Sequence, residues 1–157
     1  MKHKLQTQVV PLKDVPLEGA RQGGERRLDI LVVDDEQIIA DTLAIILAKN
    51  GYRTMAAYDG NSAMEIAREC RPALLITDVV MPQMTGIELA VALEALMPEI
   101  KVLLFSGQAA TVDLLAKARG MGREYTILSK PIHPADMLRR VSEYVEPAMQ
   151  DTYATAI

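Results

Sequence analysis

The sequence predicts an α/β protein built on a doubly wound parallel sheet. Five short apolar segments alternate along the chain with five segments whose apolar residues recur at helical spacing. The apolar segments are mostly continuous, which is typical of strands that helices cover on both faces of a parallel sheet. The chain has 157 residues, of which 50% are hydrophobic and 4% aromatic, so we expect one domain with an aliphatic core.

The first strand and helix are predicted over residues 30–50. Residues 30–33 are wholly apolar and lead directly into Asp34 and Asp35. Over residues 36–50 the apolar side chains fall at i, i+4, i+7 and i+8, which predicts a helix with one buried face. The pair Asn50–Gly51 then ends the helix, because both residues tolerate the left-handed conformation.

The second strand is predicted over residues 52–57, where apolar and polar residues mix as they do nearer the edge of a sheet. Residues 59–61, Asp–Gly–Asn, are expected to form a turn. A helix then runs through Cys70 and ends before Pro72, since a residue before proline is disfavoured in a helix.

The remaining elements follow the same alternation. The third strand, residues 73–77, ends at Asp78, and Thr85 with Glu88 has the T-x-x-E spacing that begins a helix, here through about residue 96. A fourth strand is predicted at 101–105 and leads into Ser106, and a helix follows at about 110–119. The fifth strand, at 125–129, ends at Lys130. The last helix begins at His133–Pro134, and its apolar face is formed by Met137, Leu138, Val141 and Val145.

Polar side chains stand at the carboxyl ends of four predicted strands: Asp34 with Asp35, then Asp78, Ser106 and Lys130. The carboxyl ends of parallel strands share one edge of the sheet, so these groups are expected to converge in one crevice. Carboxylates that crowd together repel unless they take up protons or a cation. Hard oxygen ligands without His or Cys favour Mg²⁺.

With a metal ion bound, such a site can accept a phosphoryl group despite its acidity. Lys130 and the metal would neutralise the phosphoryl oxygens, and the Ser106 hydroxyl would donate a hydrogen bond to them. A carboxylate can itself be the nucleophile and form an aspartyl phosphate.

Each of these residues also has an ordinary structural explanation. Asp34 and Asp35 could cap the first helix, Asp78 and Ser106 could be turn residues, and Lys130 could be a solvated charge. Their occurrence together at successive strand ends favours the functional interpretation.

At this point residues 28–146 resemble the receiver domain of two-component response regulators, of the chemotaxis-type stand-alone kind. The resemblance implies a flavodoxin-like (βα)5 fold with strand order 2-1-3-4-5. It is carried by four motifs in order: Asp34-Asp35-Glu36, Asp78-x-x-Met81-Pro82-x-Met84-x-Gly86-x-Glu88-Leu89, Ser106-Gly107 and Lys130-Pro131.

The resemblance implies that Asp78 is the phosphoacceptor. It implies that Mg²⁺ is held by Asp35, by Asp34 partly through water, by Asp78 and by the backbone carbonyl of Val80. It further implies Ser106 as the switch hydroxyl, Lys130 as the phosphoryl-binding residue, a cis bond before Pro131, and Gly107 and Gln108 as residues that flank the site.

Two departures from the family pattern stand out. The family commonly has Tyr or Phe three residues before the lysine, as an aromatic switch, but this chain has Ile127 there. Tyr125 lies two residues earlier on the same strand face and could substitute for it. The alternative is that no aromatic switch operates. The other departure is that no output domain is expected, because residues 1–27 and 147–157 have the character of a disordered tail and a short tail.

The expected function is that of a phosphorylation-dependent signalling switch in a phosphorelay, not an enzyme. Its partners would be a histidine kinase or a histidine phosphotransfer protein and an unknown downstream protein, and it would be a monomer or a weak homodimer. The net charge of −4 argues against nucleic-acid binding. A single cysteine, no long apolar run and no signal-peptide core favour a cytoplasmic protein that does not insert into a membrane.

Two other functions fit the sequence less well. A phosphatase with an aspartate nucleophile, similar to the haloacid-dehalogenase-like enzymes, would need D-x-D after the first strand and a segment to cover the substrate, whereas this chain has the adjacent pair Asp34–Asp35. A phosphate-independent binding module would fit Ile127 but leave Asp78, Ser106 and Lys130 unexplained.

Overall fold

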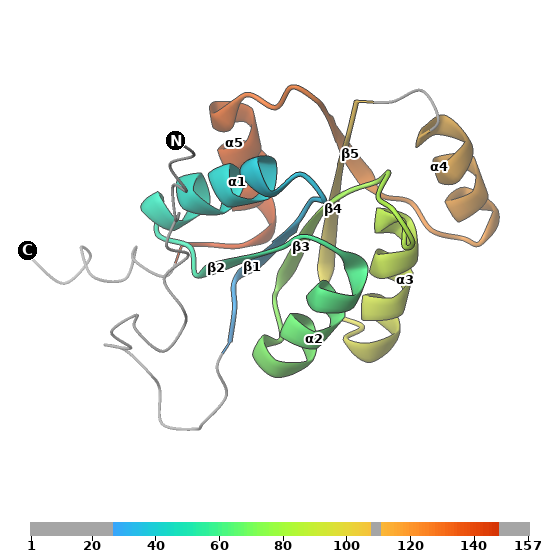
Figure 1. Ribbon diagram of the computed structural model, residues 1–157, viewed down its shortest axis with the longest axis horizontal. Coiled ribbons are helices and arrows are strands. Elements are labelled where there is room, and N and C mark those ends of the chain that lie inside the picture. The colour runs from blue at the N-terminus through green and yellow to red at the C-terminus, as the bar shows by residue number, and fades with distance from the viewer. Residues whose placement is uncertain (1–26, 108–110, 148–157) are drawn as a thin grey trace, which may run out of the picture.

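The computed structural model describes residues 27–107 and 111–147. In chain order the elements are β1 (Ile30–Val33), α1 (Gln37–Lys49), β2 (Thr54–Ala57), α2 (Gly60–Cys70), β3 (Leu74–Asp78), α3 (Gly86–Leu96), β4 (Lys101–Ser106), α4 (Thr111–Gly120), β5 (Thr126–Ser129) and α5 (Pro134–Tyr144). The strands form one parallel sheet in the order β2-β1-β3-β4-β5 (Figure 1). This confirms the predicted fold class and strand order.

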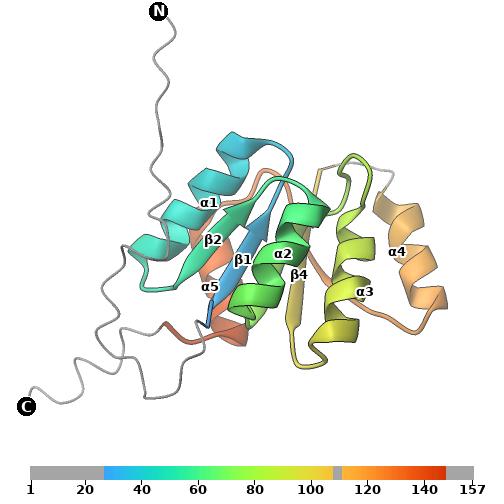
Figure 2. The ribbon, with the colours of Figure 1, turned by 60° about the horizontal axis from the view of Figure 1, so that its bottom comes forward.

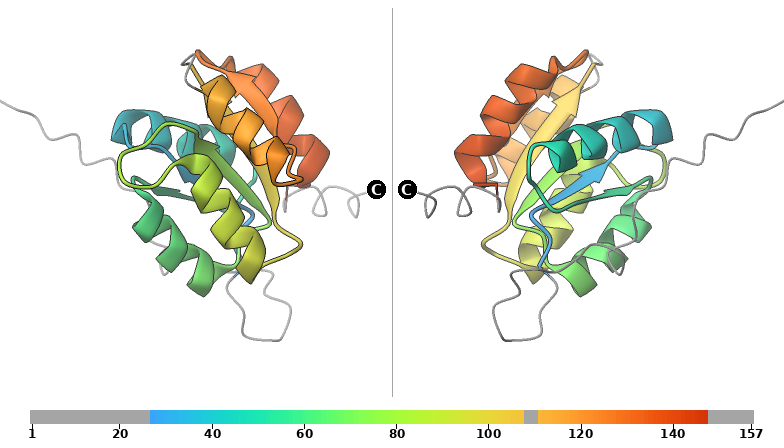
Figure 3. Two further views of the ribbon diagram at one scale, coloured as in Figure 1. Left: turned by 90° about the vertical axis from the view of Figure 1, so that its right-hand side faces the viewer. Right: turned by 90° about the vertical axis from the view of Figure 1, so that its left-hand side faces the viewer.

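The helices form two layers, one on each face of the sheet. Helices α1 and α5 cover one face, and α2 and α3 cover the other, with α4 beside α3 (Figure 1). Figure 2 shows α2 and α3 next to each other in front of the strands, and Figure 3 gives side views of the same layers. The central strands β1 and β3 are buried along their whole length, which explains why their sequences are continuously apolar.

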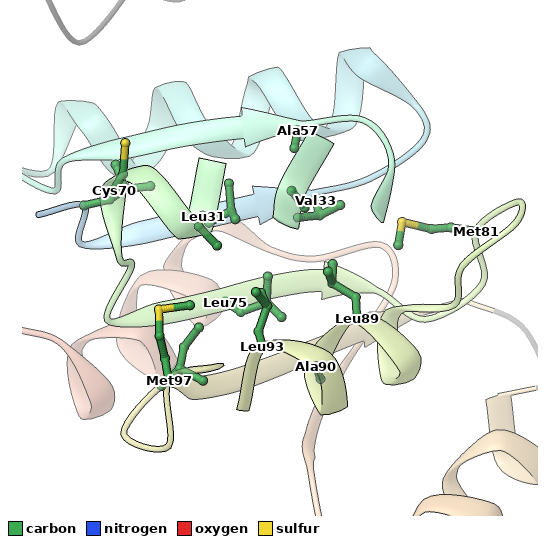
Figure 4. Packing of buried hydrophobic residues seen from close by; sticks show 14 residues of the cluster. Leu31, Val33, Ala57, Cys70, Leu75, Met81, Leu89, Ala90, Leu93 and Met97 are labelled. Carbon is green, nitrogen blue, oxygen red and sulfur yellow. The ribbon is translucent and has the colours of Figure 1, made fainter. Parts of the chain in front are cut away.

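The core is aliphatic, as the composition predicts. Between the sheet and helices α2 and α3, leucine, alanine and methionine side chains pack around Leu31 and Leu75 (Figure 4). Between the sheet and helices α1 and α5, a second cluster contains Phe105, the single phenylalanine of the chain. A third cluster joins α4 to α3 and β5 through Ala118 and Ile127. These three clusters pack the helices against the sheet and so fix the strands relative to one another.

Several helix ends follow their sequence signals. The Thr85 hydroxyl accepts a hydrogen bond from the Glu88 N–H at 3.1 Å, so the T-x-x-E spacing does begin α3. Pro134 is the first residue of α5, and the His133 imidazole caps that helix. Gly51 takes the left-handed conformation, with φ of 92°, directly after α1.

Three predicted boundaries were wrong. The Asp59 carboxylate accepts the Ser62 N–H at 2.7 Å and so caps α2, which makes residues 60–61 the first turn of that helix rather than a separate turn. Strand β2 begins at Thr54, because the Tyr52 N–H still bonds to the Leu47 carbonyl at the end of α1. At the other end of the domain Val145 is extended and lies just beyond α5.

The tails predicted for residues 1–27 and 147–157 lie outside the described residues, except for their inner ends at Arg27 and Pro147. In the part of the chain that the structure describes, none of the helices is long and apolar enough to cross a membrane.

Candidate functional site

The sheet brings the predicted site residues to its carboxyl edge. Asp34 directly follows β1, Asp78 and Ser106 are the last residues of β3 and β4, and Lys130 directly follows β5. Asp34, Asp78 and Ser106 are buried, whereas Asp35 is exposed at the mouth of the site. The parallel topology therefore converts four positions far apart in the sequence into one cluster.

Three carboxylates form the acidic part of the cluster. Asp34, Asp35 and Asp78 each contribute an oxygen, and these oxygens all lie within 4.8 Å of one another. The Asp34 side chain is fully buried, and its Oδ1 accepts the N–H of Glu36 at 2.9 Å. Asp34 supports the turn before α1 and faces the other two carboxylates, but it does not cap the helix. The N-cap of α1 is Glu36, and no side chain caps it, so the capping explanation for Asp34 and Asp35 was wrong.

Lys130 supplies the positive charge. Its Nζ donates a hydrogen bond to Oδ2 of Asp34 at 3.0 Å and lies 3.3 Å from Oδ2 of Asp78. The Lys130 N–H donates to the Ser106 carbonyl at 3.0 Å, which joins the end of β5 to the end of β4. The peptide bond from Lys130 to Pro131 is cis. The ammonium is therefore held between two carboxylates from β1 and β3.

The environment shifts the pKa of both partners. Burial raises the pKa of Asp78, the Asp34 and Asp35 charges raise it further, and Lys130 offsets only part of this effect. Burial lowers the pKa of Lys130, but hydrogen bonding to Asp34 and the charges of Asp78 and Asp34 outweigh that effect, so its pKa is raised overall. At neutral pH the lysine is charged, and it offsets only part of the effect of burial and of the neighbouring carboxylates on Asp78.

The loop after β3 is shaped by a glycine. An added Cβ on Gly86 would lie 2.0 Å from the backbone oxygen of Asp78, so no larger residue fits there without moving the backbone. The Gly86 N–H donates to the Val79 carbonyl at 2.8 Å and closes the loop. Gln83 adopts a φ of 68° in the same loop. Gly86 therefore sets the position of the Asp78 main chain.

The other predicted site residues lie at the rim. Val80 is half-buried in the loop, two residues beyond Asp78. Gly107 is exposed and packs against the Lys130 stem, since an added Cβ would lie 3.3 Å from Cβ of Lys130. Gln108 lies outside the described residues.

The position of the family's aromatic switch is filled by an aliphatic residue. Ile127 and Tyr125 both pack against the cluster between β5, α3 and α4, so they share one face of the strand. Tyr125, however, directly precedes β5 and, with Glu94, Arg123 and their neighbours, lines a pocket of about 380 Å³. Burial and Glu94 raise the pKa of Tyr125 to about 12. Tyr125 is therefore at the far end of the strand from Lys130.

The donor set fits a magnesium ion. Three carboxylates converge without any histidine or cysteine, and hard oxygen ligands of this kind are those that Mg²⁺ prefers. A divalent cation would also relieve the repulsion from Asp34 and Asp35, which adds to the effect of burial on the pKa of Asp78.

One neighbour of the site was missed in the sequence. The Lys130 Nζ lies over the ring of Phe105, 5.0 Å from the ring centroid. Phe105 precedes Ser106 on β4 and pairs in register with Asp78 of β3 and Leu128 of β5. The sequence does show a single phenylalanine next to a strand end. It does not show that the Lys130 side chain lies over the ring of this phenylalanine.

The sequence pattern of the response regulator receiver domain family matches residues 30–142. The chain is 32% identical over 115 residues to the DNA-binding response regulator MtrA of Mycolicibacterium smegmatis, an alignment that covers 73% of this chain and 49% of that protein. It is 34% identical over 114 residues to the response regulator receiver protein CpdR of Brucella abortus, covering 73% of this chain and 93% of that protein. The chain thus spans about half the length of the DNA-binding relatives it matches.

Solved structures agree. The chemotaxis protein CheY4 of Vibrio cholerae superposes with a TM-score of 0.67 at 26% identity, covering 76% of this chain and 99% of that one. A two-component transcriptional regulator from Clostridium phytofermentans superposes with a TM-score of 0.65 at 30% identity, covering 80% and 97% of the two chains. Receiver domains are signalling components of two-component systems that bind Mg²⁺ at an acidic cluster, and the corresponding cluster here is Asp34, Asp35 and Asp78. With the fold, the strand-end residues and these relatives in agreement, the chain belongs to the response regulator receiver domain family.

Proposed function

We propose that this protein is a phosphorylation-dependent switch of a two-component phosphorelay. A histidine kinase or a histidine phosphotransfer protein would donate a phosphoryl group to Asp78 in the cytoplasm. The observation that carries the proposal is the position of the Lys130 ammonium, 3.0 Å from Asp34 and 3.3 Å from Asp78 in a cluster of three carboxylates. An arrangement built only for stability would need one carboxylate beside the lysine and not a cluster of three carboxylates.

In the proposed reaction a carboxylate oxygen of Asp78 forms a bond to phosphorus while the bond from phosphorus to the donor nitrogen breaks. The electron pair of the broken bond stays with the donor imidazole. Lys130 would hold a phosphoryl oxygen, and the Ser106 hydroxyl would donate a hydrogen bond to another. Asp34, Asp35, Asp78 and the Val80 carbonyl would hold Mg²⁺, which supplies positive charge opposite the phosphoryl oxygens.

The burial of Asp78 suits this chemistry. The side chain is only 11% exposed, so the approaching donor displaces little water from it. Asp35 is exposed beside it and leaves the mouth of the site open to a donor. The site therefore combines a desolvated nucleophile with access from one side.

Phosphorylation would then change a surface made by α4, β5 and α5. Ser106 would move toward the phosphoryl group, and the elements next to β4 would follow through the cluster that contains Leu104, Ala118 and Ile127. Because Ile127 is aliphatic, we propose that the change passes through this packing and not through rotation of an aromatic side chain. The downstream partner would recognise the altered surface.

The test is incubation with Mg²⁺ and acetyl phosphate, followed by intact-mass analysis. We expect one phosphoryl group on the native chain, none without Mg²⁺ and none on Asp78→Asn. A matched control is Asp113→Asn, which removes an exposed carboxylate on α4 and should label like the native chain. Equal labelling of Asp78→Asn, or no labelling of the native chain, would sink the proposal.

A second experiment addresses the switch itself. Binding of a candidate partner is compared between the native chain and Asp78→Ala, each with and without phosphodonor. The proposal expects binding of the native chain to depend on phosphodonor and binding of Asp78→Ala to ignore it. Equal, phosphodonor-independent binding by both proteins would identify a constitutive binding module instead. Steady turnover of a phosphomonoester would point to a phosphatase.

A further inference from the structure

The ring of Phe105 lies under the ammonium of Lys130. Its side chain is fully buried, and the Lys130 Nζ lies 5.0 Å from the centroid of its ring. We infer that Phe105 is a positioning residue, which holds the Lys130 ammonium at the phosphoryl site through a cation–π contact. This inference rests on the proposed function for its meaning, because it assigns a residue to that same site.

The physical need for such a contact comes from the lysine side chain. A lysine stem has several rotatable bonds and a compact, strongly hydrated charge, so fixing it in one place costs conformational entropy. The face of an aromatic ring is negative and attracts a cation within about 6 Å of its centroid. The Lys130 side chain is only 22% exposed, and the attraction is stronger where water is largely excluded.

The ring offers something that the two carboxylates do not. Asp34 and Asp78 attract the ammonium now, but when Asp78 carries a phosphoryl group the ammonium must exchange a carboxylate oxygen for a phosphoryl oxygen. The Phe105 ring is uncharged and packed in the core, so it stays in place during this exchange. It would keep the ammonium over the site in both states.

The competing explanation is that Phe105 only fills space. It packs in the cluster between the sheet and helices α1 and α5, together with Leu103 on the same face of β4. A space-filling role depends on the volume of the ring, whereas a cation–π contact depends on the charge distribution over its face. The test must therefore change the charge distribution and leave the volume nearly constant.

The composition of the chain allows this change to be made at a single position. The chain has a single phenylalanine, so replacing all phenylalanine with fluorinated analogues changes position 105 alone. We would prepare the protein with 4-fluoro-, 3,4-difluoro- and 3,4,5-trifluorophenylalanine, because each fluorine weakens the negative ring face and adds little volume. The rate of Mg²⁺-dependent phosphorylation by limiting acetyl phosphate is expected to fall at each step, by about three- to tenfold over the series. A constant rate across the series would overturn the inference.

Substitutions give a second comparison. Phe105→Leu removes the ring, and Leu103→Val trims a fully buried side chain two residues earlier in the same cluster. Both should lower the melting temperature, but only Phe105→Leu should slow phosphorylation beyond its effect on stability. An equal slowing in both variants would assign Phe105 to packing alone.

NMR tests the contact without any activity. The ε-methylene protons of Lys130, assigned with Lys130→Arg, should be shifted upfield by the ring and return to ordinary values in Phe105→Leu. If the unsubstituted protein takes up no phosphoryl group, the proposed function fails. The upfield shift of the Lys130 ε-methylene protons still decides, in that case, whether the ring holds the lysine. Unshifted ε-methylene protons in the native protein would overturn the inference.

Discussion

Asp78 is placed where its ionisation is unfavourable and its reactivity is useful. Burial and the charges of Asp34 and Asp35 act against the ionised carboxylate, and Lys130 compensates only in part. Without a metal ion the folded protein therefore carries unfavourable electrostatic energy at this residue. A divalent cation, or removal of the Asp78 charge, would relieve it.

The first prediction concerns Asp78→Asn in metal-free buffer. The folded chain binds the Asp78 proton more tightly than the unfolded chain does, so the native protein loses stability as pH rises from near 3.8 through the raised folded pKa. Asparagine does not titrate, so Asp78→Asn does not lose stability in this way as pH rises. We expect the melting temperature of Asp78→Asn to exceed that of the native protein by a few degrees at neutral pH, measured by circular dichroism with EDTA present.

The pH dependence provides the control. As pH falls towards 3.8, a growing share of Asp78 is protonated in the folded chain, so the two melting temperatures should draw closer together. Saturating Mg²⁺ should stabilise the native protein more than the variant. A difference that stays constant from acid to neutral pH would contradict this account of Asp78.

A second prediction concerns Lys130→Met. Asp34 is fully buried and would lose the ammonium that lies 3.0 Å from its Oδ2, which leaves a buried charge with only the Glu36 N–H. We expect the free energy of unfolding without metal to fall by about 1–3 kcal/mol in urea titrations. Lys101→Met, at an exposed lysine on β4, should change it by less than about 0.5 kcal/mol. A loss in Lys130→Met as small as the one expected for Lys101→Met would show that the Lys130 contacts add no stability.

Among the elements, the loop from β3 to α3 is constrained by a close backbone contact at Gly86. A Cβ on Gly86 would lie 2.0 Å from the Asp78 oxygen, and this oxygen already accepts the Thr77 hydroxyl at 3.0 Å. Any shift of Gly86 is therefore passed directly to the residue that is proposed to react.

We expect Gly86→Ala to lower the free energy of unfolding by about 1–3 kcal/mol, because main-chain atoms must move to admit the methyl group. It should also lower Mg²⁺ affinity, measured by isothermal titration. Gly120→Ala is the matched control: an added Cβ there meets nothing within 4 Å, so the variant should be neutral or slightly more stable. If Gly86→Ala behaved like Gly120→Ala, the proposed role of the loop would be wrong.

Element boundaries show what local sequence can and cannot predict. The cap at Thr85 and the start of α5 at Pro134 were predicted, because each depends on residues within one helical turn. The start of α2 was not, since an Asp–Gly–Asn segment has the same composition whether it forms a turn or, as here, Asp59 caps a helix. The bonds that the Ser62 N–H makes to the Asp59 carboxylate and the Ala63 N–H makes to the Asp59 carbonyl distinguish the two.

For the whole molecule, parallel topology was enough to predict which residues meet. Once the strands are parallel, Asp34, Asp78, Ser106 and Lys130 must share an edge, and the sequence showed this without any distance. The Phe105 ring under Lys130 could not be predicted, because it depends on the pairing register of β4 with β5 and on the path of a flexible side chain.

The last of the predictions concerns how the change spreads. If phosphorylation acts through the cluster that joins β5 to α3 and α4, hydrogen exchange should change in α4, β5 and α5 and stay constant in β1 and β3, whose residues are fully buried. The measurement is hydrogen–deuterium exchange with and without Mg²⁺ and acetyl phosphate, with Asp78→Asn as control. A change confined to the β3–α3 loop would mean that the signal does not leave the site.

The most direct test of the central claim is to locate the phosphoryl group. After brief phosphorylation with acetyl phosphate and Mg²⁺, borohydride reduces an aspartyl phosphate to homoserine, and peptide mapping by mass spectrometry identifies the position. The account predicts homoserine at position 78 and at no other carboxylate, with none in the sample prepared without Mg²⁺. Homoserine at another aspartate, or none at position 78 despite added phosphate on the intact chain, would contradict it.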